Sequence, residues 1–276
     1  MKKTLLILLV LLNCFASFSQ SDSTRHKKIY RVRLGYELPS SIACIGLSNL
    51  GFKALGRTSY MSESDVLRLN PNDINAFDRP IAFNDPSHFA SAQKTSDLFL
   101  NISVVSPALM LFDKKIRKDW LDLLTMYMVA HAMDNAIYFG AAFAVRRPRP
   151  LTYNPGVSMA DRTGDGKSNS FFSGHMGFST TATFFAAKVF TDYNHIKGWN
   201  RILIYGAAAV PPAIVGYYRM KAGRHFKTDV IAGFISGAVS GILVPELHRI
   251  KDKHQNISFA PYYTPGASGL TVNVGL

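Results

Sequence analysis

Apolar residues in this chain of 276 residues are grouped into long segments that shorter polar stretches separate. Five of these segments, rich in Ala, Leu, Met and Phe, lie at about 98–112, 119–145, 172–190, 200–218 and 228–247. Each is longer than a typical strand and is bounded by charged residues, which is the pattern of a helix. With a further apolar segment at 38–52, the pattern predicts an all-α protein, a helical bundle of about five to six main helices.

Three other stretches depart from this pattern. From residue 53 to 97 the chain is polar and carries helix breakers, as in NPNDINAFDRP, so we expect loops with short helices there. The last residues, ISFAPYYTPGASGLTVNVGL, hold two alternating runs around a Pro-Gly turn, which predicts a short C-terminal β-hairpin. The first residues combine two lysines, an apolar run and a small-residue site, which is the layout of a secretory signal peptide.

These changes of pattern divide the chain into four parts. We expect a signal peptide at residues 1–19, a basic segment with a first helix and loops at 20–94, a helical core at 95–250 and a hairpin extension at 251–276. Removal of the signal leaves Cys44 as the single cysteine, so no intramolecular disulfide is expected.

The helices can belong to a soluble core or to a membrane bundle. Their charge-free cores are shorter than the roughly 20 residues that cross a bilayer, which suits a soluble core. Gly233, Gly237 and Gly241, however, recur at the four-residue spacing that membrane helices use for close packing. This spacing favours integration into a membrane.

The chain is strongly basic, with a formal net charge of +13. Such a charge favours anionic partners, and we expect an anionic membrane surface and a phosphorylated substrate. Nucleic acid is not expected as a partner, because the signal peptide predicts export from the cytoplasm.

Three polar islands interrupt the apolar helices and contain the candidate chemistry. They are VRRPRP at 145–150, NSFFSGHMGF at 169–178 and GYYRMKAGRHFKTDV at 216–230. In the third island, His225 and Asp229 share one face if a helix begins near residue 225. A carboxylate there can fix the imidazole tautomer and leave the other nitrogen free as a nucleophile, although a capping or salt-bridging pair has the same spacing.

The other two islands offer an anion-binding helix start and paired arginines. Ser173, Gly174 and His175 open a helix, where backbone amides can point at an anion and an imidazole can protonate a leaving group. Arg147 and Arg149 alternate with prolines, and a guanidinium held in this way can grip phosphate oxygens.

Taken together, RP at 149–150, SGH at 173–175 and R-x5-H-x3-D at 219–229 resemble the three motifs of the type 2 phosphatidic acid phosphatase (PAP2) superfamily. That superfamily includes bacterial acid phosphatases, lipid phosphate phosphatases and vanadium haloperoxidases. The resemblance covers about residues 95–248 and makes the helical core a PAP2-type phosphatase core. It implies a hydrolase of phosphomonoesters or diphosphates, such as lipid phosphates of the cell envelope, that needs neither metal nor cofactor. The expected location is the periplasm, or the inner membrane with a periplasm-facing site.

The resemblance also implies a role for each matching residue. His225 attacks phosphorus and forms a phosphohistidine, Asp229 orients and charges it, and His175 protonates the leaving oxygen and then serves as base for water. The phosphoryl oxygens are held by a second set of groups: Arg149, Arg219, Ser173 and the Gly174 amide.

The chain departs from the family pattern at a phosphate-binding position. Ala142 stands where the family has its lysine, while Phe172 and Tyr218 replace a proline and a serine beside the motifs. Since Arg146 lies one turn after Ala142, we expect its longer side chain to bind phosphate in place of the lysine. Two alternatives stay open: a vanadate-dependent haloperoxidase built on the same pocket, and a catalytically impaired phosphate-binding envelope protein.

A polar loop links the first two islands. Within it, Lys167 and Asn169 are candidate substrate contacts, and a solvated loop accounts for them equally well.

Overall fold

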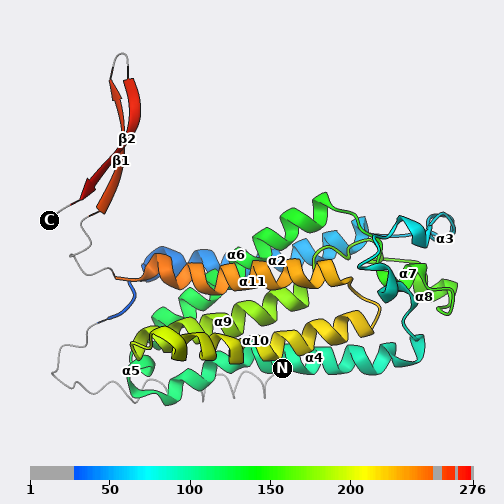
Figure 1. Ribbon diagram of the computed structural model, residues 1–276, viewed down its shortest axis with the longest axis horizontal. Coiled ribbons are helices and arrows are strands. Elements are labelled where there is room, and N and C mark those ends of the chain that lie inside the picture. The colour runs from blue at the N-terminus through cyan, green and yellow to red at the C-terminus, as the bar shows by residue number, and fades with distance from the viewer. Residues whose placement is uncertain (1–27, 251–256, 265–266, 275–276) are drawn as a thin grey trace.

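The computed structural model describes residues 28–250, 257–264 and 267–274 (Figure 1). The predicted signal peptide at residues 1–19 lies outside the described residues.

Six long helices form the body of the described chain (Figure 1). In chain order they are α2 (Leu34–Thr58), α4 (Phe89–Val105), α6 (Trp120–Ala144), α9 (Gly174–Tyr193), α10 (Gly198–Lys221) and α11 (Lys227–His248). The prediction of a helical bundle is therefore confirmed. The polar interval is narrower than predicted, because α2 continues to Thr58 and α4 already begins at Phe89.

Short elements connect these helices. The α-helical ones are α3 (Glu63–Leu67), α5 (Lys114–Arg117), α7 (Pro150–Tyr153) and α8 (Met159–Arg162). The 3-10 turns are η1 (Pro71–Asp73), η2 (Arg79–Phe83), η3 (Pro86–His88) and η4 (Ser106–Phe112).

Two strands, β1 (Ile257–Thr264) and β2 (Ala267–Val274), follow α11 in the chain. They pair antiparallel, with Ile257 opposite Val274 and Thr264 opposite Ala267. The hairpin stays a prediction, because its turn at 265–266 lies outside the described residues.

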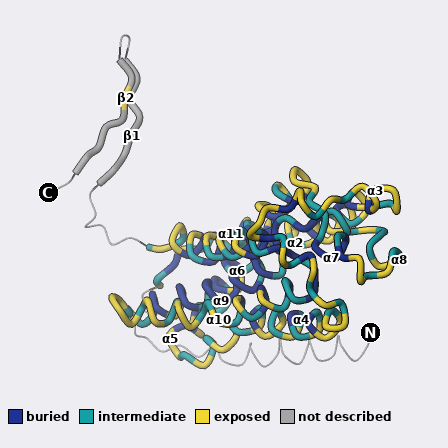
Figure 2. Tube along the Cα trace, turned by 45° about the vertical axis from the view of Figure 1, so that its right-hand side comes forward, coloured by how far each residue is buried: buried dark blue, intermediate teal, exposed yellow. Residues whose placement is uncertain are grey.

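Helix α9 forms the centre of the bundle and packs against α4, α6, α10 and α11. Fifteen of its 20 residues are buried, which makes α9 the dark core of Figure 2. Its position matters for function because its first turn carries the second polar island.

Helix α11 packs closely on α9 through the glycines that the sequence singled out. A Cβ atom at Gly233, Gly237 or Gly241 would lie only 2.5, 2.3 or 2.7 Å from a backbone oxygen of the segment from Ser173 to Thr181. Only a glycine fits such distances, so the predicted close packing is present in the fold.

The opposite face of α11 is exposed and apolar. Ile231, Ile235, Val239 and Leu243 follow one another at four-residue spacing, and Leu247 extends the stripe. Two segments, Pro86–Phe112 and Lys227–His248, are long and apolar enough to cross a membrane by length and composition.

The two ends of α2 lie at opposite ends of the bundle. Before α2 begins, the Arg31 amide donates to the carbonyl of His248 at the end of α11. Near its other end, the carbonyl of Gly56 accepts from the amide of Gly166, in the loop that leads to the second island. This second end of the bundle holds the candidate active site.

Candidate active site

Backbone hydrogen bonds join the three polar islands pairwise. The Ser170 amide donates to the Arg147 carbonyl, which ties the second island to the first. The Ser173 amide donates to the Asp229 carbonyl, which ties the second to the third. The Leu151 amide donates to the Gly223 carbonyl, just past the first island. The three motifs therefore lie side by side in the fold.

Gly223 allows the third island to turn between α10 and α11. Its φ of +64° lies in the left-handed region, and a Cβ atom there would come within 2.8 Å of the Phe89 ring. Glycine meets both constraints, and the turn brings His225 back toward the ends of the other islands.

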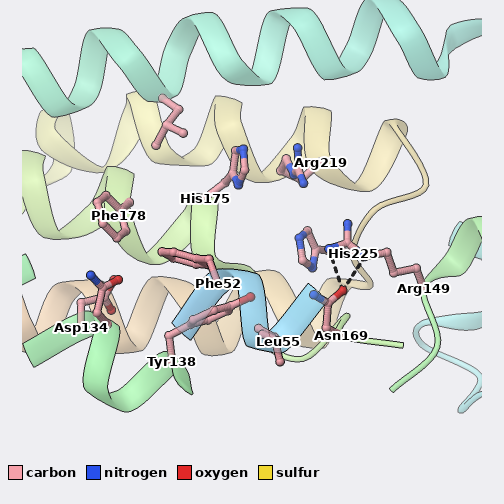
Figure 3. Close-up of a pocket in the computed structure, with 13 residues that line it drawn as sticks. Phe52, Leu55, Asp134, Tyr138, Arg149, Asn169, His175, Phe178, Arg219 and His225 are labelled. Atoms are coloured by element: carbon pink, nitrogen blue, oxygen red, sulfur yellow. Dashed lines mark hydrogen bonds between the residues drawn. The ribbon is translucent and has the colours of Figure 1, made fainter. Parts of the chain in front are cut away.

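A cavity of about 370 Å³ lies at this junction (Figure 3). Its polar side is formed by candidate residues from all three islands: Arg149, Asn169, Gly174, His175, Arg219 and His225. Its other side is lined by the apolar residues Phe52, Leu55, Leu100 and Phe178, together with Asp134, Asn135 and Tyr138. One cavity thus combines an anion site with a surface suited to an apolar group.

His225 is buried and lines this cavity. Its Nδ1 lies 2.8 Å from the Ser170 carbonyl oxygen and must donate to it, which leaves Nε2 unprotonated in the neutral ring. Burial, followed by the positive charges of Arg149 and Arg219, holds the pKa of His225 well below its ordinary value. The ring is therefore neutral at neutral pH, with an unprotonated Nε2.

Asp229 does not contact the His225 ring, contrary to the sequence-based expectation. Helix α11 begins at Lys227, so His225 precedes the helix and the expected i, i+4 pairing on one face does not form. Instead, the Asp229 carboxylate accepts from the Phe226 amide at 2.8 Å and from the Ser170 hydroxyl at 2.5 Å. Ser170 therefore links the two residues: its hydroxyl donates to Asp229, and its carbonyl accepts from the imidazole of His225.

Arg147 is a structural partner of Asp229 and does not line the cavity. Its Nη1 donates to Asp229 at 2.6 Å, and its Nη2 donates to Asp78 at 2.8 Å. Both carboxylates are fully buried. Asp78 also accepts from the backbone amide and the hydroxyl of Thr228, at 3.0 and 2.6 Å. The guanidinium thus neutralises two buried charges behind the site.

Arg149 is the arginine of the first island that faces the cavity. Its Nε and Nη2 both donate to the Asn169 side-chain oxygen, at 3.0 and 2.9 Å (Figure 3). Burial, with Arg224 as the next cause, lowers the pKa of Arg149 to about 10. A partly buried cation with a neutral partner is well suited to bind an anion.

The start of α9 adds further donors. Ser173 precedes the helix, and its hydroxyl is buried without a hydrogen-bond partner among the described residues. The Nε of Arg219 is also buried, and it too has no hydrogen-bond partner among the described residues. Gly174 and Arg219 line the cavity, whereas Ser173 is not among its lining residues. The first-turn amides from Gly174 onward and the Arg219 guanidinium are donors of the kind that a phosphoryl group requires.

His175 lies in the first turn of α9 and contacts a residue that the sequence did not indicate. Its Nε2 is 3.2 Å from an Asp97 carboxylate oxygen on α4. The same carboxylate is 3.7 Å from Nη1 of Arg219, and that nitrogen donates to Gln93 at 2.8 Å. Asp97 therefore contacts both His175 and Arg219, and Gln93 holds Arg219 as well.

The structure does not support the expected role of Arg146. Helix α6 ends at Ala144 and Val145 is extended, so Arg146 is not on the helical face of Ala142. The Arg146 side chain is exposed, and it is not among the residues that line the cavity.

Tyr138, one turn before Ala142, does line the cavity. Its ring lies against Gly174, where a Cβ atom would be only 3.2 Å away. Figure 3 shows Tyr138 on the side of the cavity across from the arginines. The sequence did not indicate Tyr138 as a site residue, because the first family motif specifies only the position of its lysine, which is Ala142 in this chain.

The geometry agrees with comparison to known proteins. The sequence model of the PAP2 superfamily matches residues 120–252. This match assigns residues 120–252 to the PAP2 superfamily. The matched residues hold all three islands, including both candidate histidines and the arginines that face the cavity.

Two solved structures resemble the fold. One is a transmembrane PAP2-type phosphatidylglycerolphosphate phosphatase from Bacillus subtilis, with 21% identity and a TM-score of 0.46 over 75% of this chain and 94% of that one. The other is LpxE from Aquifex aeolicus, with 19% identity and a TM-score of 0.41 over 61% of this chain and 92% of that one. No curated protein sequence matches this chain.

Proposed function

We propose that this PAP2 protein is a phosphatase that hydrolyses phosphate monoesters or diphosphates of lipids through a phosphohistidine. The observation that carries the proposal is the hydrogen bond from His225 Nδ1 to the Ser170 carbonyl, since it leaves Nε2 as the nucleophile beside two arginines. The apolar side of the same cavity supports a lipid leaving group.

The reaction follows from these groups in two steps. In the first, the Nε2 lone pair of His225 forms a bond to phosphorus while the bond to the leaving oxygen breaks and His175 gives that oxygen a proton. In the second, His175 takes a proton from water, whose oxygen displaces His225 and releases inorganic phosphate. Arg149 and Arg219 stabilise the charge on the phosphoryl oxygens in both steps, helped by the first-turn amides of α9.

A location within a membrane is part of the proposal. The stripe from Ile231 to Leu247 covers about 24 Å of α11 and is apolar and exposed, whereas its buried face holds glycines and serines. A water-soluble bundle has the reverse distribution, so a lipid environment accounts better for this surface.

The fold restricts the orientation of such a bundle. The segment before α2 and the active site lie at opposite ends of α2. If α2 crosses the bilayer, an exported N-terminal segment and a periplasmic site exclude one another. In a Cys44→Ser background, a cysteine at Arg31 and one at Ser158 should react with an impermeant maleimide from opposite sides. Labelling of both from the same side would contradict a spanning α2.

The function is tested with purified protein and a panel of lipid phosphates, lipid diphosphates and soluble phosphate esters. We expect phosphate release, an alkali-stable phosphohistidine and loss of both in His225→Gln, while the exposed His88→Gln retains both. A labelled intermediate that persists in His225→Gln would refute the assigned nucleophile. Halide oxidation that appears only with vanadate, in the absence of phosphate release, would identify a haloperoxidase.

A further inference from the structure

A second cavity, of about 390 Å³, adjoins the candidate active site. Its polar lining comes from Gln93, Ser158, Asp161, Lys167 and Arg224. Two contacts show that the cavities share a wall. Arg224 lines the second cavity and the next residue, His225, lines the first. Gln93 lines the second and accepts a hydrogen bond from Arg219, which lines the first.

Lys167 and Arg224 bring positive charge into this second cavity. Both side chains are partly buried, and Arg224 forms no ion pair with any described residue. Burial lowers the pKa of both groups, and the charges of Arg224 and Arg149 lower that of Lys167 further. Arg224 in turn lowers the pKa of Arg149, so these cations lie close enough to repel one another.

Two carboxylates offset this charge only in part: the charge of Asp161 raises the pKa of Lys167, and that of Asp97 raises the pKa of Arg224, while burial still leaves both pKa values lowered. Asp161 Oδ2 accepts from the Ser158 hydroxyl at 2.7 Å, and Lys167 donates to the backbone oxygen of Asp161 rather than to its carboxylate. Cations held together in a partly buried place are costly, and an anion that contacts several of them offsets that cost.

We propose that this cavity is a second anion subsite, in which Lys167 and Arg224 bind a further phosphoryl group of the substrate while the first lies beside His225. The proposal rests on the proposed phosphatase function and narrows its substrate to esters that carry two phosphoryl groups in sequence. In that arrangement the terminal phosphoryl group is attacked beside His225, and the group bound by Lys167 and Arg224 carries the alcohol and leaves with it.

Binding to the His225→Gln protein tests the subsite without turnover. Titration calorimetry with inorganic phosphate and with inorganic diphosphate, at constant ionic strength, should give tighter binding of diphosphate. Lys167→Gln and Arg224→Gln, each made separately, should weaken diphosphate binding about tenfold and phosphate binding much less, since each removes a charged hydrogen bond from one ligand only. The exposed Arg68→Gln serves as the charge-matched control and should alter neither affinity.

These outcomes distinguish a second phosphoryl subsite from non-specific attraction of anions to positive charge. If both ligands weaken equally, or neither weakens, the second subsite is refuted; thermal unfolding of each variant shows which ones are folded and therefore count. With the native His225, a lipid diphosphate and the monophosphate of the same alcohol should differ in kcat/KM, and Arg224→Gln should remove that difference. If no ester is hydrolysed, the proposed function fails, while the calorimetry still reports on the subsite.

Discussion

Three arginines within four residues should respond to substitution in three different ways. Arg147 bridges two carboxylates, Asp78 and Asp229, whose side chains are fully buried. In Arg147→Met both would lose their cationic partner, and breaking a buried ion pair in this way costs about 3–5 kcal/mol. In a domain of this size that corresponds to a fall in Tm of roughly 6–20 °C.

Arg149 should show the opposite behaviour. Its side-chain partner is the neutral amide of Asn169, and its charge is opposed by that of Arg224. Arg149→Met should therefore leave Tm unchanged or raise it. Turnover should fall by a factor of about 100–1,000, as for loss of one donor to a transition-state oxyanion. Arg146→Met, which removes an exposed side chain outside the cavity, should change neither quantity.

Thermal unfolding and phosphate release, measured on the same detergent-solubilised preparations, test this set. Denaturant titration of the same variants provides a second measure of stability in case thermal unfolding is irreversible. Equal loss of stability in Arg147→Met and Arg149→Met would refute the separation of structural and binding roles. Loss of activity in Arg146→Met with an unchanged Tm would restore Arg146 as the substitute for the missing lysine.

Three further predictions concern packing, the phosphate site and pH. Gly237→Ala should lower Tm strongly because its Cβ atom would lie 2.3 Å from a backbone oxygen, whereas Gly206→Ala, with nothing within 4 Å, should not; equal effects would refute close packing of α11 on α9. Tyr138→Phe should keep the fold and weaken phosphate binding about tenfold, as for one hydrogen bond to a charged group; unchanged affinity would remove the hydroxyl from the site. Because the pKa of His225 is held well below 6.5, its neutral form persists as pH falls. The p-nitrophenolate leaving group needs no proton from His175. Single-turnover phosphorylation by p-nitrophenyl phosphate, corrected for substrate ionisation, should therefore stay constant from about pH 8 to 5.5, and a decline centred near 6.5 would contradict the lowered pKa.

The helices and the convergence of the islands were predictable because both depend on local pattern. The apolar segments bounded by charged residues predicted the boundaries of the six long helices to within a few residues, except at the ends of α2 and α4. The islands meet because each lies at a helix end on the same side of an antiparallel bundle. Alternation of direction between neighbouring helices then brings residues 149, 175, 219 and 225 together.

Contacts between distant segments could not be predicted in this way. Asp97 lies 78 residues before His175, and Gln93 lies 126 residues before Arg219. No periodicity within either helix indicates that α4 packs beside α9 and α10. The two errors at Arg146 and Asp229 have a common origin, since each argument assumed a helix where the backbone is extended or not yet helical.

The departures at Ala142 and Phe172 belong together in the structure. Both residues lie in one apolar cluster with Leu55 and Tyr138, so the small Ala142 side chain leaves space for the Phe172 ring that replaces the family proline. A lysine stem at position 142 would enter this cluster. The same cluster holds the Tyr138 ring beside Gly174, one helical turn before Ala142. Tyr138 therefore lines the cavity one helical turn from the position of the missing lysine, and it brings a neutral hydroxyl rather than a positive charge. Arg149 and Arg219 are the cations that the described structure places in the lining of this cavity.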